Sequence, residues 1–334
     1  MRTPLIIGLA PTLALALGLF ALVVPALAAN PPTLAALALP AGKPKELGAV
    51  RWLRGYDSAA TRAREARRPL LVLFNEVPGC HTCVSFGKEV LTDALLVEAA
   101  ESLFTPLAVY NNIGGEDAMT LDRFREPAWN NPVVRVIDPA NNKDLTTRVG
   151  DNYGIGTVAA AMATGLKAGG TEPPGYLKLL AQTPAPESKT ERAVFAMFCF
   201  WEGEAKLGGL TGVVSTSSGF MDGKECVEVE FDPARLSFRD LIKAAKQMDC
   251  LHATYTTTID QQAVASSLVG SRAHRATGTM RVSESDTKYH LSRSAYREVP
   301  MTPMQACRVN AELGAGREPE TWLSPKQLRS KRGE

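Results

Sequence analysis

The sequence predicts an α/β domain followed by an α+β domain, and three observations carry this prediction. A buried strand over residues 70–77 leads into Cys80-His81-Thr82-Cys83 and then into helical sequence. A second cysteine, Cys199, stands among aromatic residues where another strand gives way to a helix. Between them, residues 169–190 are rich in proline and glycine, which is typical of a domain boundary. We therefore expect two domains, each with a thiol at the start of a helix.

The first domain is expected over residues 49–168. Its predicted order is helix, strand, helix, strand, strand, short edge strand and helix. These elements are predicted at 57–68, 70–77, 84–102, 103–111, 133–138, 145–149 and 156–166. Pro132 directly precedes the third strand, and this order of elements is that of a thioredoxin fold.

Residues 50–167 resemble the thioredoxin superfamily, and Val77-Pro78-Gly79-Cys80 is similar to a group of exported thioredoxin-like proteins and selenoproteins. The resemblance implies that Cys80 is the attacking thiol, that Cys83 resolves the mixed disulfide, and that Pro132 is a cis-proline facing them. His81 is either a stabiliser of the Cys80 thiolate or a solvated loop residue. The alternatives are an inert disulfide or half of a zinc site, but no second ligand pair stands at similar spacing. We expect redox exchange without a metal or other cofactor.

The second domain is expected over residues 191–325. Its predicted order is strand, helix, strand, strand, helix, at 193–198, 200–207, 213–219, 227–231 and from Ser237 onward. This βαββα order predicts a ferredoxin-like antiparallel α/β plait.

The segment Phe198-Cys199-Phe200-Trp201-Glu202-Gly203-Glu204 is similar to the signature of the peptide methionine sulfoxide reductase A family, where glycine precedes the cysteine. The similarity covers residues 191–249 and includes the strand from Glu225 to Phe231. It implies that Cys199 attacks the sulfoxide sulfur, that Phe200 and Trp201 hold the methyl group, and that Glu225 protonates the departing oxygen. The alternative for the aromatic segment is plain core packing.

The residue pattern is consistent with that chemistry. A sulfoxide sulfur is a poor electrophile until its oxygen is protonated, so a thiolate and a carboxylic acid must meet in one pocket. Glu225 has the strand parity of Val227 and Phe231, which predicts a buried carboxyl with a raised pKa. Phe198, in place of the family's glycine, is expected to crowd the site. Tyr255 either replaces a tyrosine lost with a shortened loop or is structural.

Oxidised Cys199 would become a sulfenic acid, which condenses with a nearby thiol. Cys250 is the first candidate for that thiol and Cys307 the second, and Cys80 could also act directly. Cys226 is a poor partner because it points away from the face of Glu225. The alternative is that Cys250 and Cys307 are buried thiols or a structural disulfide.

The N-terminus predicts export. An apolar run over residues 5–24 precedes Ala26-Leu27-Ala28, which fits a signal peptide over residues 1–28, although an uncleaved membrane anchor is the alternative. Residues 29–48 are expected to be a linker and residues 326–334 a frayed, solvated basic tail. The predicted location is periplasmic or extracellular, with a membrane tether if the signal is retained.

Together these features predict an exported thiol oxidoreductase. It would reduce methionine sulfoxide in peptides or proteins, the S epimer by resemblance, at Cys199, and the Cys80/Cys83 pair would recycle it. An unknown external thiol or membrane donor would supply electrons, and the net charge of +2 gives no sign of a nucleic-acid partner. The alternative is a thioredoxin-like disulfide reductase or isomerase whose second domain only binds substrate.

Overall fold

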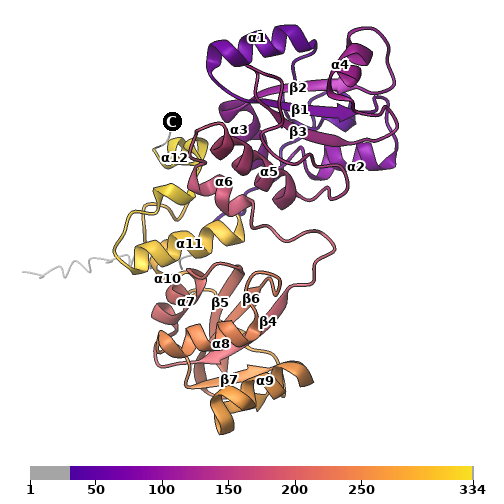
Figure 1. Cartoon of the computed structure of the whole chain (residues 1–334). Helices are drawn as coiled ribbons and strands as arrows, with labels where there is room; N and C mark the ends of the chain where they lie inside the picture. The colour runs from indigo at the N-terminus through magenta and orange to yellow at the C-terminus, as the bar shows by residue number, and fades with distance from the viewer. Residues whose placement is uncertain (1–30, 333–334) are drawn as a thin grey trace, which may run out of the picture.

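The structure is a computed structural model that describes residues 31–332, so the predicted signal peptide lies outside the described residues. Two domains are stacked, and a C-terminal helical segment lies between them (Figure 1). Within the described range, no helix is both long and apolar enough to cross a membrane.

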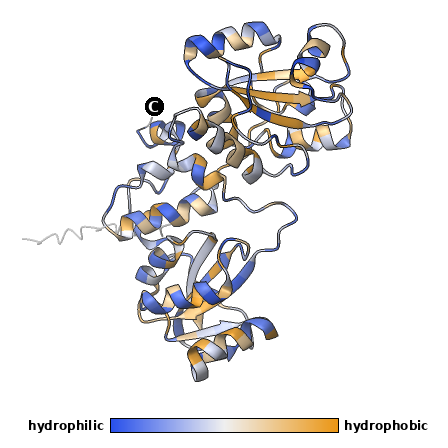
Figure 2. Cartoon of the chain, viewed as in Figure 1, coloured by the Kyte–Doolittle hydropathy of each residue, from blue (hydrophilic) through white to orange (hydrophobic). Residues whose placement is uncertain are grey.

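The first domain has a three-stranded sheet in the order β2-β1-β3, with β1 parallel to β2 and antiparallel to β3. Helices α1 and α4 cover one face, and α2, α3, α5 and α6 cover the other. The elements are α1 (Tyr56–Ala66), β1 (Leu70–Asn75), α2 (His81–Glu89), α3 (Ala94–Leu103), β2 (Thr105–Tyr110), α4 (Glu116–Phe124), β3 (Val133–Ile137), α5 (Ile155–Ala168) and α6 (Gly175–Leu180). Because both faces are covered, the strands are mostly hydrophobic, with the buried Arg135 of β3 as an exception (Figure 2).

The structure corrects several predicted elements of this domain. The helix expected over 84–102 is two helices, because the Asp93 side chain accepts a hydrogen bond from Leu96 N (2.8 Å) and starts α3 anew. The expected edge strand at 145–149 makes only isolated bridges to β3. Helix α4 was not predicted, and α6 lies inside the segment expected to be a linker.

The second domain has a six-stranded sheet in the order β8-β7-β4-β6-β5-β9. Its central four strands are antiparallel in the order β7-β4-β6-β5, which is the predicted ferredoxin-like plait. Helices α7, α8 and α9 pack on one face. The elements are β4 (Glu191–Ala196), α7 (Phe200–Gly208), β5 (Val213–Met221), β6 (Lys224–Phe231), α8 (Phe238–Gln247), β7 (Ala253–Thr256), α9 (Ile259–Val269), β8 (Ala273–Arg275) and β9 (Arg281–Val282).

The C-terminal segment contains α10 (Tyr289–Ser292), α11 (Pro303–Gly314) and α12 (Pro325–Lys331). Helix α11 packs on α7 of the second domain. The basic tail is therefore not frayed over residues 326–331. It is helical, and Glu98 of α3 accepts hydrogen bonds from Ser324 Oγ (2.6 Å) and Lys326 N (2.8 Å).

The segment expected to be an N-terminal linker is packed over its described residues. A short 3-10 helix, η1 (Lys45–Leu47), lies against α2, where a Cβ on Gly87 would be 2.0 Å from Lys45 O. Glu46 is buried there. This segment therefore helps to build the first thiol centre.

Candidate functional sites

Cys80 and Cys83 form the first thiol centre, at the point where β1 feeds α2. Cys80 is the exposed N-cap of α2, and its Sγ lies 3.1 Å from the Sγ of the buried Cys83. Burial alone would raise the pKa of Cys80, but hydrogen bonds from Cys83 and from the Thr82 backbone lower it below the ordinary thiol value. Burial, together with the neighbouring Cys80, raises the pKa of Cys83 to about 12. The pair thus holds one activated thiol and one protonated thiol.

The surrounding loops hold this centre in place. The Asn131–Pro132 peptide bond is cis, as predicted, and Asn131 Oδ1 accepts a hydrogen bond from Cys83 Sγ (2.7 Å). Glu46 Oε1 accepts one from Gly79 N (2.8 Å). His81 is exposed, and its ring contacts the Ser85 hydroxyl at 3.5 Å.

Glu76 adds a carboxylate to the two sulfurs. Its oxygen and the Cys80 and Cys83 Sγ atoms lie within 4.8 Å of one another. A thiophilic cation could find three donors there, but the Cys83 thiol would first have to lose a proton with a pKa of about 12.

Cys199 forms the second thiol centre, at the end of β4. It is the half-buried N-cap of α7, and the next residue, Phe200, is buried in the core under the sheet. The Glu225 carboxylate accepts a hydrogen bond from Phe200 N at 3.0 Å. The Glu225 carboxylate therefore lies at the N-terminus of the helix that Cys199 caps.

Glu225 lies on the predicted strand face but is less buried than predicted. It stands near the start of β6, where the strand meets solvent, and it is only half-buried. It lines a small cleft with Phe198, whose side chain is 86% exposed. Phe198 therefore points away and does not crowd Cys199. The loop before β6 is a tight turn at Asp222-Gly223 with positive φ at both residues, as in a type I′ hairpin.

Trp201 is held from two sides by the C-terminal segment. Its ring stacks on Tyr289 with centroids 4.0 Å apart, and its Nε1 donates a hydrogen bond to Asp286 Oδ1 (2.9 Å). The Arg293 guanidinium lies 3.7 Å from the centroid of the Tyr289 ring. Trp201 was predicted as a site residue, but its partners Tyr289 and Asp286 were not, because they stand far along the chain.

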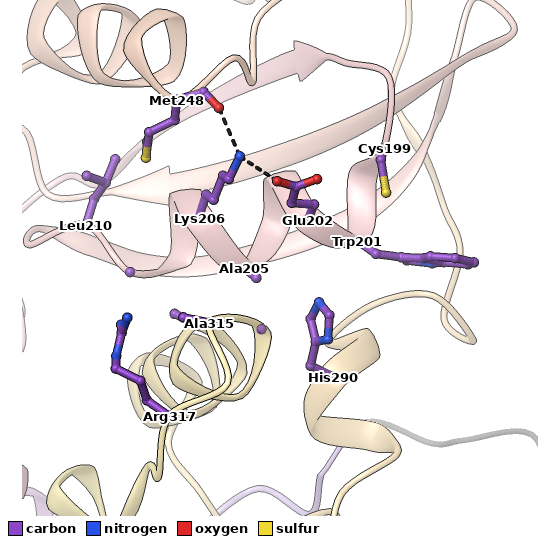
Figure 3. Close-up of a pocket in the computed structure, with 13 residues that line it drawn as sticks. Cys199, Trp201, Glu202, Ala205, Lys206, Leu210, Met248, His290, Ala315 and Arg317 are labelled. Carbon is purple, nitrogen blue, oxygen red and sulfur yellow. Dashed lines mark hydrogen bonds and ion pairs between the residues drawn. The ribbon is translucent and has the colours of Figure 1, made fainter.

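A cavity of about 610 Å³ opens beside Cys199, between α7 and the C-terminal segment (Figure 3). Figure 3 shows Lys206 bound to Glu202 and to the Met248 carbonyl on one wall, with His290 facing them across the cavity. Burial lowers the pKa of His290. The charges of Lys206 and Glu202 pair with each other. Apolar side chains also line the cavity, namely those of Trp201, Leu210 and Met248.

Cys250 lies in the loop that leads into β7, next to a residue of the Cys199 cavity. Strand β4 pairs with β7 so that Val194 faces Tyr255 and Ala196 faces Ala253. The pairing ends there, and Phe198 and His252 are both bends, so Cys199 and Cys250 lie in the loops that follow β4 and precede β7. Cys250 Sγ donates a hydrogen bond to Met248 O (3.4 Å), and Met248 lines the cavity of Cys199.

The charges around Cys250 indicate the same location. Burial raises the pKa of Cys250 to about 11, and the charges of Lys206 and Glu202, both in the Cys199 cavity, also act on it.

The other candidates lie elsewhere. Cys307 packs against Gly208 at the opposite end of α7, and its Sγ lies 3.5 Å from Thr216 Oγ1 beneath that helix. Tyr255 is buried on the sheet face opposite α7, together with Cys226. The structure therefore does not bring Tyr255 to the thiol centre, and Cys226 points away from Glu225 as expected.

A buried ion pair beneath α7 was missed from sequence. The Glu204 side chain is fully buried and pairs with Lys288 Nζ at 2.7 Å. Thr216 and Ser218 also donate hydrogen bonds to this carboxylate. One signal in the sequence could have indicated it: Glu204 lies four residues after Phe200, on the apolar face of α7, where a charged side chain needs a buried partner.

Comparisons with known proteins match both parts of the chain. A family model described as thioredoxin-like matches residues 51–139. Peptide methionine sulfoxide reductase A5 of Oryza sativa subsp. japonica is 39% identical over 67 residues, which are 16% of this chain and 26% of that protein. The Geobacter metallireducens reductase is 36% identical over 70 residues, covering 16% and 43% of the two chains. The mitochondrial reductase of Bos taurus is 39% identical over 77 residues, covering 18% and 33%.

The chain thus spans less than half the length of these curated relatives. A solved structure of the oxidoreductase DsbH is also similar, with a TM-score of 0.30 and 17% identity, covering 38% of this chain and 94% of that one. The chain therefore joins a thioredoxin-like domain to a segment of about 70 residues that is similar to peptide methionine sulfoxide reductase A.

Proposed function

We propose that this protein is a thiol oxidoreductase that reduces methionine sulfoxide in peptides or proteins at Cys199. The observation that carries the proposal is the hydrogen bond from Phe200 N to the Glu225 carboxylate (3.0 Å), because it places that carboxylate at the N-terminus of the helix that Cys199 caps. The similarity to peptide methionine sulfoxide reductase A supports this substrate. By the resemblance, we propose the S epimer.

In the proposed reaction, the Cys199 thiolate attacks the sulfoxide sulfur while Glu225 donates a proton to its oxygen. The product is methionine and a Cys199 sulfenic acid. The Cys250 thiol then attacks the sulfur of that sulfenic acid, so that a Cys199–Cys250 disulfide forms and water leaves. One sulfoxide and two thiols therefore give one thioether, one disulfide and one water, without a cofactor.

The Cys80/Cys83 pair is proposed to reduce this disulfide. An external thiol or a membrane donor would then reduce Cys80/Cys83. The apolar N-terminal run and its Ala-x-Ala end support export, so we propose that the reaction takes place in the periplasm or outside the cell.

The test is single-turnover reduction of dabsyl methionine sulfoxide, each epimer separately, by the reduced protein after removal of reductant. We expect a first equivalent of methionine per chain from the S epimer and none from Cys199→Ser. Cys307→Ser, which removes a thiol at the other end of α7, is the matched control and should retain the reaction.

A second candidate function has one observation in its favour. Glu225 lines a different cleft from the large cavity beside Cys199. If the wild-type protein reduces neither epimer, the second domain is a binding module for a thioredoxin-like disulfide reductase or isomerase.

A further inference from the structure

The two thiol centres of one chain are held apart. Cys80 is at the N-terminus of α2 in the first domain and Cys199 at the N-terminus of α7 in the second. In Figure 1, α6 and α11 stand between the helices that carry them. Neither Cys80 nor Cys83 lines the cavity of Cys199.

The N-terminal segment ties the domains in this arrangement. Leu34 N donates to Met301 O (3.0 Å) and Met301 N donates to Pro32 O (2.9 Å), next to the start of α11. Three residues beyond Leu34, Leu37 N donates to Thr92 O (2.8 Å) of the first domain.

The C-terminal segment makes a second, independent tie. Ser324 and Lys326 bind Glu98 on α3, and Gly175 of α6 packs so closely on Thr321 that a Cβ there would lie 2.4 Å from its carbonyl oxygen. Arg235 of the second domain also donates to Ala181 O (3.0 Å). To bring Cys80 to its own Cys199, both ties would have to open.

Each thiol nevertheless lies beside an exposed aromatic side chain. Trp129 is 82% exposed, two residues from Asn131, whose side chain contacts both sulfurs of the first pair. Phe198 is 86% exposed and directly precedes Cys199. Charged side chains accompany them, because Glu76 adjoins Cys80 and the exposed Lys224 shares the cleft of Phe198 with Glu225.

We propose that the Cys80/Cys83 pair of one copy reduces the Cys199–Cys250 disulfide of a second copy, with Trp129 and Glu76 meeting Phe198 and Lys224. This inference rests on the proposed function. The Cys80 thiolate attacks the disulfide and forms a mixed disulfide, which Cys83 resolves. Two thiols are then regenerated on the second copy, and Cys80 and Cys83 of the first copy become a disulfide.

Dependence on concentration tests this route. Reduced wild-type protein, freed of reductant, is mixed with excess dabsyl methionine sulfoxide at protein concentrations over a hundredfold range. We expect a first equivalent of methionine per chain at a rate independent of protein concentration, and a second equivalent whose rate rises in proportion to it. A concentration-independent second equivalent, or none, overturns the proposal, whereas absence of the first equivalent refutes the proposed function.

Mixing two variants gives an independent test. Cys80→Ser alone is expected to produce one equivalent and Cys199→Ser alone none. An equimolar mixture of the two should produce two equivalents per Cys80→Ser chain, because the second variant donates from its intact Cys80/Cys83 pair. A yield that stays at one equivalent means that no transfer occurs between chains and overturns the proposal.

The surface is tested by Trp129→Ala, which should slow the second equivalent of the wild-type experiment about tenfold, as for a buried aromatic anchor of an interface. Met119→Ala is the matched control, because Met119 is 63% exposed on α4 of the same domain but is not next to the redox loop. Equal effects of the two substitutions would show that this surface does not guide the encounter.

Discussion

The two thiol centres share a plan and differ in where the second sulfur comes from. In both, a strand delivers an N-cap cysteine to the first turn of a helix, and a buried thiol of raised pKa stands nearby. In the first centre the second thiol is one turn along the same helix, so local sequence fixes the pair. In the second centre the candidate, Cys250, lies in the loop between α8 and β7, so only the tertiary fold brings it near the cavity of Cys199. A local pair is suited to repeated thiol–disulfide exchange, and a pair between elements leaves room for a substrate beside the first thiol.

The largest expected contrast is within the first centre. With a pKa of about 12, only about one Cys83 in 10⁵ is a thiolate at pH 7, whereas Cys80, with its lowered pKa, exceeds the about 1–3% of an ordinary thiol. Cys80 should therefore alkylate at least about 10³-fold faster. Mass spectrometry of iodoacetamide-treated protein between pH 5 and 9 measures this, and the Cys80 rate should level off at a lower pH than that of free cysteine. Equal alkylation rates of Cys80 and Cys83 would contradict the assignment of Cys80 as the attacking thiol and Cys83 as the resolving thiol.

Glu225→Gln tests the acid of the second centre. Loss of a general acid should slow single-turnover sulfoxide reduction by about 10²–10⁴-fold. Glu228→Gln is the matched control, because Glu228 is on the opposite face of the same strand, half-buried and facing Arg192. If both substitutions slow the reaction equally, loss of charge or stability is the cause and Glu225 is not the acid.

Glu204→Gln tests the buried pair that supports α7. It leaves the Lys288 ammonium buried without its partner, and we expect a loss of about 3–5 kcal/mol in the free energy of unfolding. Glu202→Gln breaks the exposed pair with Lys206 on the same helix and should cost less than about 1 kcal/mol. Urea denaturation measures both. A small effect of Glu204→Gln would mean that the pair does not anchor α7.

Cys250→Ser should have the smallest effect on rate. The first chemical step does not use Cys250, so single-turnover methionine formation should continue. The Cys199 sulfenic acid should then persist and be labelled by dimedone. Cys307→Ser should give no label beyond the wild-type level, since Cys307 is at the far end of α7. Dimedone labelling in Cys307→Ser but not in Cys250→Ser would reverse the assignment.

Much of the fold could be predicted because its signals are local. Apolar runs located β1, β4 and β6, and the βαββα order gave the plait. Local signals failed where a single side chain decides, as when Asp93 restarts a helix, and where polar residues pack through tertiary contacts, as in α12. The parity of Glu225 was predicted correctly, but its burial was not, because alternation along a strand does not report how near the strand end is to solvent.

The sequence by itself determined the chemistry: two helix-capping thiols, a Cys-x-x-Cys pair, and a glutamate on the strand face next to Cys199. Only the tertiary structure decided which residues join them. Cys250 lies in the loop between α8 and β7, beside Met248 of the Cys199 cavity, while strand alternation turns Tyr255 to the sheet face opposite α7. Tyr289 and Asp286 reach Trp201 because the C-terminal segment folds back over α7. The physical reason is that covalent spacing fixes neighbours within a helix turn or a strand, whereas contacts between elements depend on how whole faces are buried against each other.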